Sequence, residues 1–209
     1  MTPDARNALE HLRDASQFSW SIVPLALIVL YLYFAEVERR NWSAVLAGLA
    51  FWGMDWFNEI WNSLVFHWTG RAPVWGASGD SSYQILIGLN VEISLMFLVL
   101  GLASPKMLPP DRTMKIAGLP NRVVLGVVNA TLCVGVEIVL NQIGVLTWDW
   151  SWWSMGMPVL ILAVGYAPFF AAAYIVHDMK HLKHKVATVG VVLGIDAAAL
   201  AIFGSLGWL

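Results

Sequence analysis

The chain has 209 residues, of which 58% are apolar and 12% are charged, and this charged share is about half the ~25% usual in soluble domains. With a mean hydropathy of +0.66, this composition excludes an ordinary soluble enzyme and a disordered chain. The net charge of −2 gives no indication of nucleic-acid binding. The single cysteine, Cys133, excludes an internal disulfide and a cysteine-rich metal site. A polytopic membrane protein of the all-α class is the remaining prediction.

A helix needs about 20 apolar residues to cross the ~30 Å hydrocarbon core of a bilayer. About six stretches of the chain meet or nearly meet this length, at 20–34, 43–66, 83–103, 123–146, 158–176 and 186–208. Their short connections predict sequential antiparallel packing into one transmembrane helical domain over residues 1–209.

The segment before the first span is more polar. Thr2, Pro3 and Asp4 form a typical helix start, with proline in the first turn. Apolar residues then recur at every third position, at Leu9, Leu12, Ala15 and Phe18. Residues 1–18 are therefore predicted to contain an amphipathic helix lying on the membrane surface, with a frayed polar tail as the alternative.

The basic residues predict how the bundle is oriented. The side that holds both termini has three of them: Arg6, Arg13 and Arg71. The opposite side has nine: Arg39, Arg40, Lys106, Arg112, Lys115, Arg122, Lys180, Lys183 and Lys185. Because cytoplasmic loops are enriched in Lys and Arg, we expect both termini outside the cytoplasm, with a bacterial inner membrane as the favoured location.

Five acidic residues lie within the apolar stretches, and no Lys or Arg lies at a comparable depth. They are Asp55, Glu59, Glu92, Glu137 and Asp196. A charged side chain at the centre of a span costs ~2.5 to 3.5 kcal/mol, and such residues are usually functional or face the bundle interior. Counted along each span, the five fall near the midplane or in the outer half, which predicts one shared polar chamber.

The spacing of these acids predicts that they face inward. On the second span, the spacing i, i+3, i+4 and i+7 puts four polar residues on one helix face: Asp55, Asn58, Glu59 and Asn62. Similar stripes recur every fourth residue at Asn129, Cys133, Glu137 and Asn141, and at Gln84, Gly88, Glu92 and Met96. One interpretation is that protonated carboxyls and amides hydrogen-bond between helices as structural contacts. The other is chemical, because a carboxylic acid held neutral is a proton donor.

Aromatic residues surround the acids. The chain has 12 Trp, and the run Trp148 to Trp153 is placed to cap the chamber or to form an interface belt. The predicted pocket wall and acid-orienting residues are Trp52, Trp56, Asn58, Trp61, Asn62, Asn141, Tyr166 and Phe169. Because aromatic faces attract cations, such a pocket suits chemistry that creates a carbocation.

A small helical membrane protein with a glutamate in the second span and an aspartate in the last one resembles the integral-membrane terpene cyclases. These include the enzymes of fungal meroterpenoid and indole-diterpene pathways and their bacterial relatives. The matching residues are Glu59, within Asp55 to Trp61, and Asp196, within Gly194 to Ala197. The resemblance implies that these acids start cyclisation by protonating an epoxide or an alkene. The chain departs from that family in having six predicted spans where the family usually has seven.

The predicted function is a proton-initiated cyclase or isomerase of a lipophilic isoprenoid, with membrane lipid around it and no metal or cofactor required. Glu59 is the expected acid and Asp55 its neighbour, with Asp196, Glu92 and Glu137 as further catalytic acids or bases. A cation or solute transporter, or the substrate-binding subunit of a vitamin importer, would use the same acids. A carboxylate-bound metal centre is the third alternative, although no histidine lies at this depth. The oligomeric state is not predicted.

Overall fold

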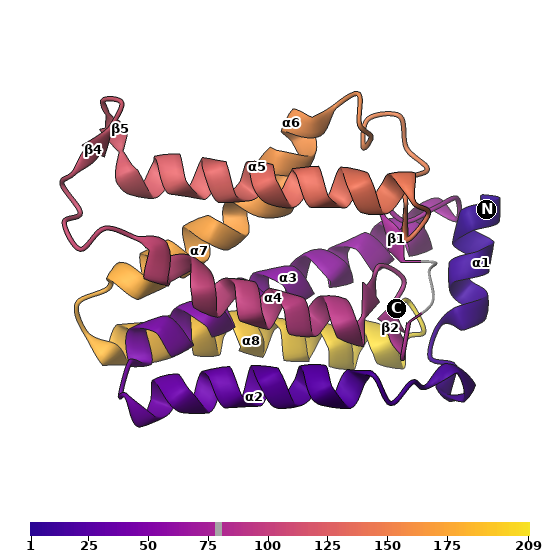
Figure 1. Ribbon diagram of the computed structural model, residues 1–209. Coiled ribbons are helices and arrows are strands. Elements are labelled where there is room, and N and C mark those ends of the chain that lie inside the picture. Colours follow the sequence, from indigo (N-terminus) through magenta and orange to yellow (C-terminus); the bar gives the residue numbers. More distant parts are fainter. Residues whose placement is uncertain (78–80) are drawn as a thin grey trace.

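The computed structural model describes residues 1–77 and 81–209, which form a bundle of long helices (Figure 1). The α-helices are α1 Pro3–His11, α2 Ile22–Glu38, α3 Trp42–Thr69, α4 Val91–Ala103, α5 Asn121–Gln142, α6 Pro158–Leu160, α7 Ala167–Asp178 and α8 Leu182–Ser205. Shorter helical turns are η1 Ala15–Gln17, η2 Ser104–Met107 and the π-helical η3 Ile161–Tyr166. The strands are β1 Gly76–Ala77, β2 Gln84–Leu86, β3 Leu89–Asn90, β4 Lys115–Ile116, β5 Leu119–Pro120 and β6 Leu146–Thr147.

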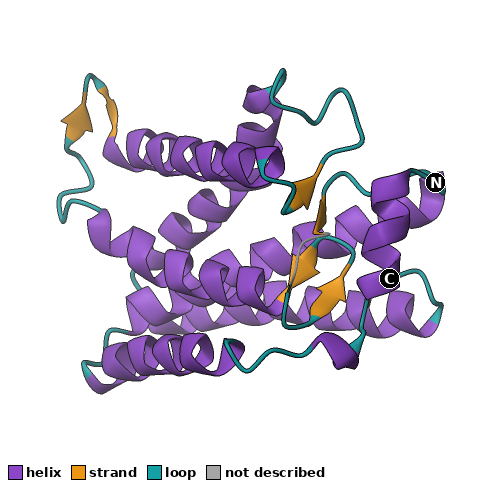
Figure 2. Ribbon diagram, turned by 45° about the vertical axis from the view of Figure 1, so that its right-hand side comes forward, coloured by secondary structure: helices purple, strands orange, loops and turns teal. Residues whose placement is uncertain are grey.

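The predicted all-α membrane fold is confirmed at the level of its helices. Within the described residues, three continuous helical segments are long and apolar enough to cross a bilayer: Asn121–Gln142, Pro158–Asp178 and Leu182–Ser205. Their most apolar windows have mean hydropathies of 2.3, 2.2 and 2.2. The described strands are short and lie in the segments that connect the helices (Figure 2). They pair as β1 with β6, β2 with β3 and β4 with β5.

The expected third span, 83–103, is wrong in its first half. Its beginning folds as the antiparallel hairpin of β2 and β3, and α4 starts only at Val91. Asn90 ends the hairpin and caps the helix, because its Oδ1 accepts the backbone N–H of Ile93 at 2.8 Å. The 13 residues of α4 are ~20 Å long at 1.5 Å per residue, which is shorter than the hydrocarbon core.

Helix α3 is the centre of the bundle and packs against α4, α7 and α8. Small residues allow this close approach, since a Cβ atom at Gly101 of α4 would lie 2.7 Å from Cβ of Phe51. The buried ring of Phe51 meets Phe169 and Phe170 of α7 edge-on, with ring centroids 5.5 and 5.0 Å apart. This aromatic core fixes α7 relative to α3, and so fixes the residues that flank it.

The fifth expected span is interrupted by the π-helical η3, which joins α6 to α7. Pro168, near the start of α7, has no N–H to donate to the carbonyl four residues earlier, which belongs to Val164. That carbonyl instead accepts the side-chain amide of Asn58 on α3 at 3.3 Å. The irregular turn thus exposes a backbone acceptor to the polar face of α3.

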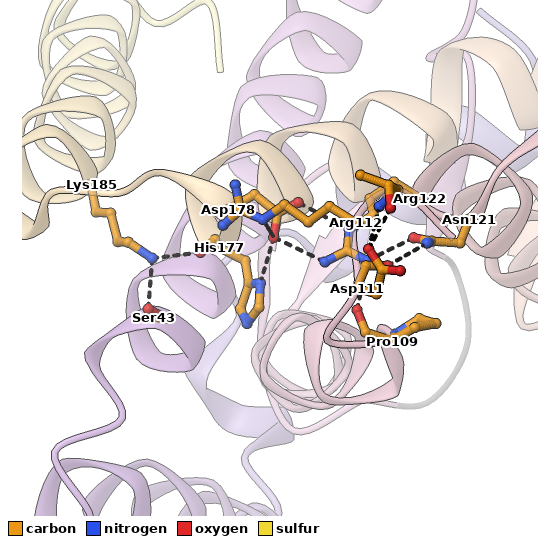
Figure 3. A network of polar contacts seen from close by, with 10 residues as sticks. Ser43, Pro109, Asp111, Arg112, Asn121, Arg122, His177, Asp178 and Lys185 are labelled. Atoms are coloured by element: carbon orange, nitrogen blue, oxygen red, sulfur yellow. Dashed lines mark hydrogen bonds and ion pairs between the residues drawn. The ribbon is translucent and has the colours of Figure 1, made fainter. Parts of the chain in front are cut away.

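Both termini lie at the same end of the bundle (Figure 1). At the opposite end, Asp178 pairs with Arg122 at 2.9 Å, with Arg112 at 3.4 Å and with Nδ1 of His177 at 3.1 Å (Figure 3). Near the same end, Glu36 of α2 is held by Lys106, Arg39 and Asn41. Asp178 and Glu36 at this end are therefore paired with basic side chains, unlike the acids deeper in the bundle.

Candidate functional site

A cavity of about 620 Å³ lies among α3, α4, α5 and η3. Most of its wall is apolar or aromatic, including Phe97 of α4 and Phe169 of α7. Three carboxyl side chains reach it: Asp55 and Glu59 from α3, and Glu137 from α5. Among the described residues, the cavity therefore brings together three of the five acids, whereas one shared polar chamber for all five was expected.

Glu59 is the most constrained of these carboxyls. The side chain is buried, and its Oε1 accepts the indole N–H of Trp75 at 2.8 Å. Its other oxygen, Oε2, is buried without a hydrogen-bond partner among the described residues. Gly88, at the tip of the β2–β3 hairpin, makes room for this oxygen, because a Cβ atom there would lie 2.6 Å from Oε2. One oxygen of Glu59 is thus anchored, and the other is available to donate or accept a proton.

Asn62, one turn beyond Glu59 on α3, does not line the cavity but holds the segment that carries Trp75. Its Oδ1 accepts the backbone N–H groups of Val74 and Trp75 at 2.6 and 3.3 Å, and its Nδ2 donates to the Trp75 carbonyl at 2.7 Å. The side chain is fully buried. Asn62 is therefore a positioning residue that holds the Trp75 segment and also lies beside the Glu59 carboxyl itself.

Glu137 lies across the cavity on α5. Its Oε1 accepts the indole N–H of Trp148 at 3.2 Å, and the Tyr166 hydroxyl faces the same carboxyl. The indole of Trp153 also lies beside it and stacks on Trp75, with ring centroids 5.2 Å apart. The segment 145–157 therefore covers the cavity at this end, which is one of the two positions expected for the Trp148 to Trp153 run.

Asp55 lies one turn before Glu59 on the same face of α3, as its spacing predicted. It is buried, and its Oδ2 has no hydrogen-bond partner in the part of the chain that the structure describes. Asn58 lies between the two acids in sequence, lines the cavity and donates to the Val164 carbonyl. The polar face of α3 is thus anchored through its amides, while its carboxyls keep unpartnered oxygens.

Positive charge is missing from the cavity. None of the described residues that line it is Lys or Arg. An isolated carboxylate in apolar surroundings is costly enough that such a group usually neutralises, and removing the cationic partner of a buried charge is strongly destabilising. The arrangement therefore favours a neutral carboxylic acid, which is a proton donor, where hydrogen-bond donors are missing, as at Oδ2 of Asp55 and Oε2 of Glu59.

Several predicted site residues have structural contacts instead. Trp52 and Trp56 donate their indole N–H groups to Oγ of Ser94 on α4, at 2.9 and 3.3 Å. Trp61 packs against Trp75, with centroids 6.1 Å apart, and Asn141 donates to the Leu146 carbonyl at 3.0 Å. These four residues support the wall from outside, whereas Asn58, Tyr166 and Phe169 line the cavity.

Two of the five acids are not in the cavity wall. Asp196 of α8 is buried against α3, where a Cβ atom at Gly53 would lie 3.5 Å from its Oδ2. Glu92 is in the first turn of α4, where its Oε1 accepts the backbone N–H of Ser82 at 2.7 Å. The expected depth of Glu92 is wrong, because the residues before it form a hairpin. For the same reason, the predicted helical stripe from Gln84 to Glu92 does not exist.

Other cavity residues were not predicted from the sequence. Trp75 and Leu132 were not expected at the site, and Gly88 and Met96 were expected only in an inward-facing helical stripe. The signal for Trp75 is weak, because it lies in a loop with no helical spacing to the acids. Among the described residues, no group of three or more His, Cys, Asp or Glu side chains is arranged to hold a metal ion.

Apolar helices enclosing acids without basic partners define the class of this molecule, an integral membrane protein with a buried acidic pocket. The chain belongs to a family described as an uncharacterized membrane protein family, whose model matches residues 2–205. An uncharacterized protein of the archaeon Archaeoglobus fulgidus is 52% identical over 205 residues, covering 98% of this chain and 97% of the relative. A second protein of that organism is 54% identical over 56 residues, 26% of this chain and 100% of the relative. No solved structure matches the chain.

These relationships correct two expectations. The resemblance to integral-membrane terpene cyclases is wrong, since the family that matches nearly the whole chain is a different one. Size and two acidic positions were too little to identify a family without a contiguous motif. The relatives also come from an archaeon, so the expected bacterial inner membrane has no support, while location in a membrane does.

Proposed function

We propose that the protein is an intramembrane acid catalyst that isomerises or cyclises a lipophilic, isoprenoid-type alkene or epoxide. The observation that carries this proposal is the apolar cavity in which Glu59 has one anchored and one unpartnered oxygen. A neutral acid in a cavity that excludes water protonates a weakly basic carbon more effectively than a solvated one does.

Glu59 donates and Glu137 accepts the protons that the reaction moves. Glu59 donates a proton from Oε2, and the electron pair of the substrate double bond forms the new C–H bond. The carbocation that remains faces the rings of Phe97, Phe169 and Tyr166, whose electron-rich faces stabilise positive charge. If a second double bond of the substrate attacks the cation, a ring closes.

Glu137 is the group best placed to end the reaction. As a carboxylate it removes a proton from the carbon next to the cation, and that C–H electron pair becomes the new double bond. Glu59 is then ionised and Glu137 is protonated, so the number of protons at the site is unchanged. The site is reset when Glu137 gives up its proton and Glu59 takes one up, with exchange against solvent protons, and no redox cofactor is consumed.

The test is product formation in heavy water. Purified protein in lipid nanodiscs is incubated in D₂O with a panel of isoprenoid alkenes and epoxides, and the products are analysed by mass spectrometry. We expect one carbon-bound deuterium per turnover in the product and a loss of product of at least ~100-fold in Glu59→Gln, in line with general acid catalysis. Glu10→Gln is the matched control on the exposed α1 helix. Full activity in Glu59→Gln would refute the assignment.

A second candidate, a proton-coupled or cation-coupled solute carrier, is favoured by one observation. Two irregular segments lie beside the acids, namely the hairpin tip at Gly88 and the π-helical η3. Broken helices at mid-membrane are typical of transporter binding sites. Uptake of a labelled cation or vitamin into proteoliposomes, abolished by Glu59→Gln without any chemical conversion, would support this candidate over the enzyme.

The proposed topology is six crossings with both termini outside the cytoplasm. In addition to the three apolar helices, α3 has 28 residues, or ~42 Å at 1.5 Å per residue. Helix α2 has 17 residues, and α4 is extended by η2. The common end of the two termini and the basic residues at the opposite end support this topology.

A further inference from the structure

One side of the cavity is formed by side chains that also face the outside of the bundle. Met96 of α4 is 48% exposed, while Leu132 and Val136 of α5 are 63% and 55% exposed, and all three line the cavity. Helix α5 packs on α7 and η3, and in Figure 1 it runs apart from α4. Residues that are both exposed and cavity-lining mark a mouth between α4 and α5.

This mouth lies along the apolar length of the helices. Its residues are in the middle of α4 and α5, and α5 is one of the helices apolar enough to cross the membrane. The wall continues past α4 to Leu25 and Ile28 of α2, which makes the cavity elongated. A mouth at this position faces hydrocarbon and not water.

The end of the cavity near the termini is covered instead. Trp75, Leu146 and Trp153 are buried there and belong to its wall. The covering segments are pinned together, because Trp150 donates its indole N–H to the Pro73 carbonyl at 2.8 Å and β1 pairs with β6. The described residues therefore place an indole layer between the carboxyls and the bulk water at that end.

We propose that the substrate is a long apolar chain dissolved in the bilayer, and that it enters sideways between α4 and α5. Its reactive end reaches Glu59 while its tail stays in the groove between Met96 and Val136 or in the lipid. The chemistry at the carboxyls rests on the proposed function, but the entry route is a separate claim and is tested without turnover.

The native thiol of Cys133 is the probe for this route, because it is the single cysteine of the chain and it lines the cavity. Protein in nanodiscs is treated with two thiosulfonate reagents of the same thiol chemistry, one alkyl and lipid-soluble, the other charged and restricted to water. We expect the alkyl reagent to label Cys133 at least ~10-fold faster. Equal rates, or faster labelling from water, would overturn lateral entry. No labelling by either reagent, with full labelling after denaturation, would show a sealed cavity and also overturn it.

A pair of variants on one helix tests the position of the mouth. Val136→Trp narrows the proposed mouth and should slow labelling by the alkyl reagent about fivefold or more. Val139→Trp is the matched control, because Val139 is equally exposed, at 55%, but lies outside the cavity wall. If the two variants label alike, the mouth is not there. Lateral labelling without any product in D₂O would instead refute the catalytic proposal and leave the route intact.

Discussion

The indole rings of Trp75 and Trp153 stack with their centroids 5.2 Å apart and their planes 30° apart, so that they join the two sides of the cavity. The N–H of Trp75 is bonded to Glu59, whereas Trp153 lies beside Glu137. The buried indole nitrogen of Trp153 has no hydrogen-bond partner among the described residues. The pair therefore packs the residue that holds Glu59 against the residue that lies beside Glu137.

The first prediction concerns the donor of Trp75. Trp75→Phe keeps an aromatic ring in the stack but removes the N–H that anchors Oε1 of Glu59. A lost hydrogen bond of this kind is worth about 1 to 2 kcal/mol, so we expect roughly a tenfold slower turnover. Product rates in nanodiscs provide the measurement, and Trp61→Phe is the control, since Trp61 packs on the Trp75 ring while the hydrogen bond to Glu59 comes from Trp75. Equal rates for the two variants would show that the Trp75 N–H has no part in catalysis.

The second prediction concerns the space at Gly88. A Cβ atom there would lie 2.6 Å from Oε2 of Glu59 and 2.5 Å from Nδ2 of Asn62. Gly88→Ala therefore displaces the Glu59 carboxyl without changing any titratable group, and we expect activity to fall about tenfold or more, because misplacement of a reacting group is costly. Gly190→Ala on α8, where no atom lies within 4 Å of the added Cβ, is the matched control. Wild-type activity in Gly88→Ala would place the reacting oxygen elsewhere.

The third prediction uses Glu36, which lies beyond the expected first span, 20–34, and does not line the cavity. Hydrogen bonding from Lys106 holds the pKa of Glu36 below its usual value, with help from Asn41 and against the effect of burial. The stability it contributes is present at neutral pH and is lost as pH falls through that lowered pKa. We expect Glu36→Gln to be less stable by about 1 to 2 kcal/mol at pH 7.

Thermal unfolding in detergent measures this effect. The gap in Tm between wild type and Glu36→Gln should narrow as pH falls below about 4.5, because the wild-type carboxyl becomes protonated there. A gap that stays constant or widens on acidification would mean that the ion pair does not hold α2 to the end of α4.

The helical spacing of the polar residues predicted which side chains of α3 and α5 face the cavity. The spacing of Asp55, Asn58 and Glu59 places them on one face, and that face is buried toward the cavity. Glu137 meets them from α5, as its polar stripe predicted. Such positions are predictable because a continuous helix fixes the direction of each side chain from its sequence number.

The remaining parts of the site depend on turns and loops, whose residues have no regular period in the sequence. Hydropathy does not distinguish the hairpin of residues 84–90 from helix, and so Glu92 was placed too deep. Trp75 reaches Glu59 only because Asn62 binds the backbone of the loop between them. The π-helical η3 lies just before Pro168, packs against α5 and accepts the Asn58 amide at Val164, and of these features the sequence alone shows only the proline.

Infrared spectroscopy of the protein in nanodiscs at pH 7 shows whether Glu59 carries a proton. A neutral carboxylic acid has a C=O stretching band separate from that of a carboxylate, and the band shifts in D₂O. We expect such a band in the wild-type protein, clearly reduced in Glu59→Gln and unchanged in Glu36→Gln, whose carboxyl is ion-paired. Absence of the band, or the same band in Glu59→Gln, would show that Glu59 holds no proton to donate and would refute its role as the acid.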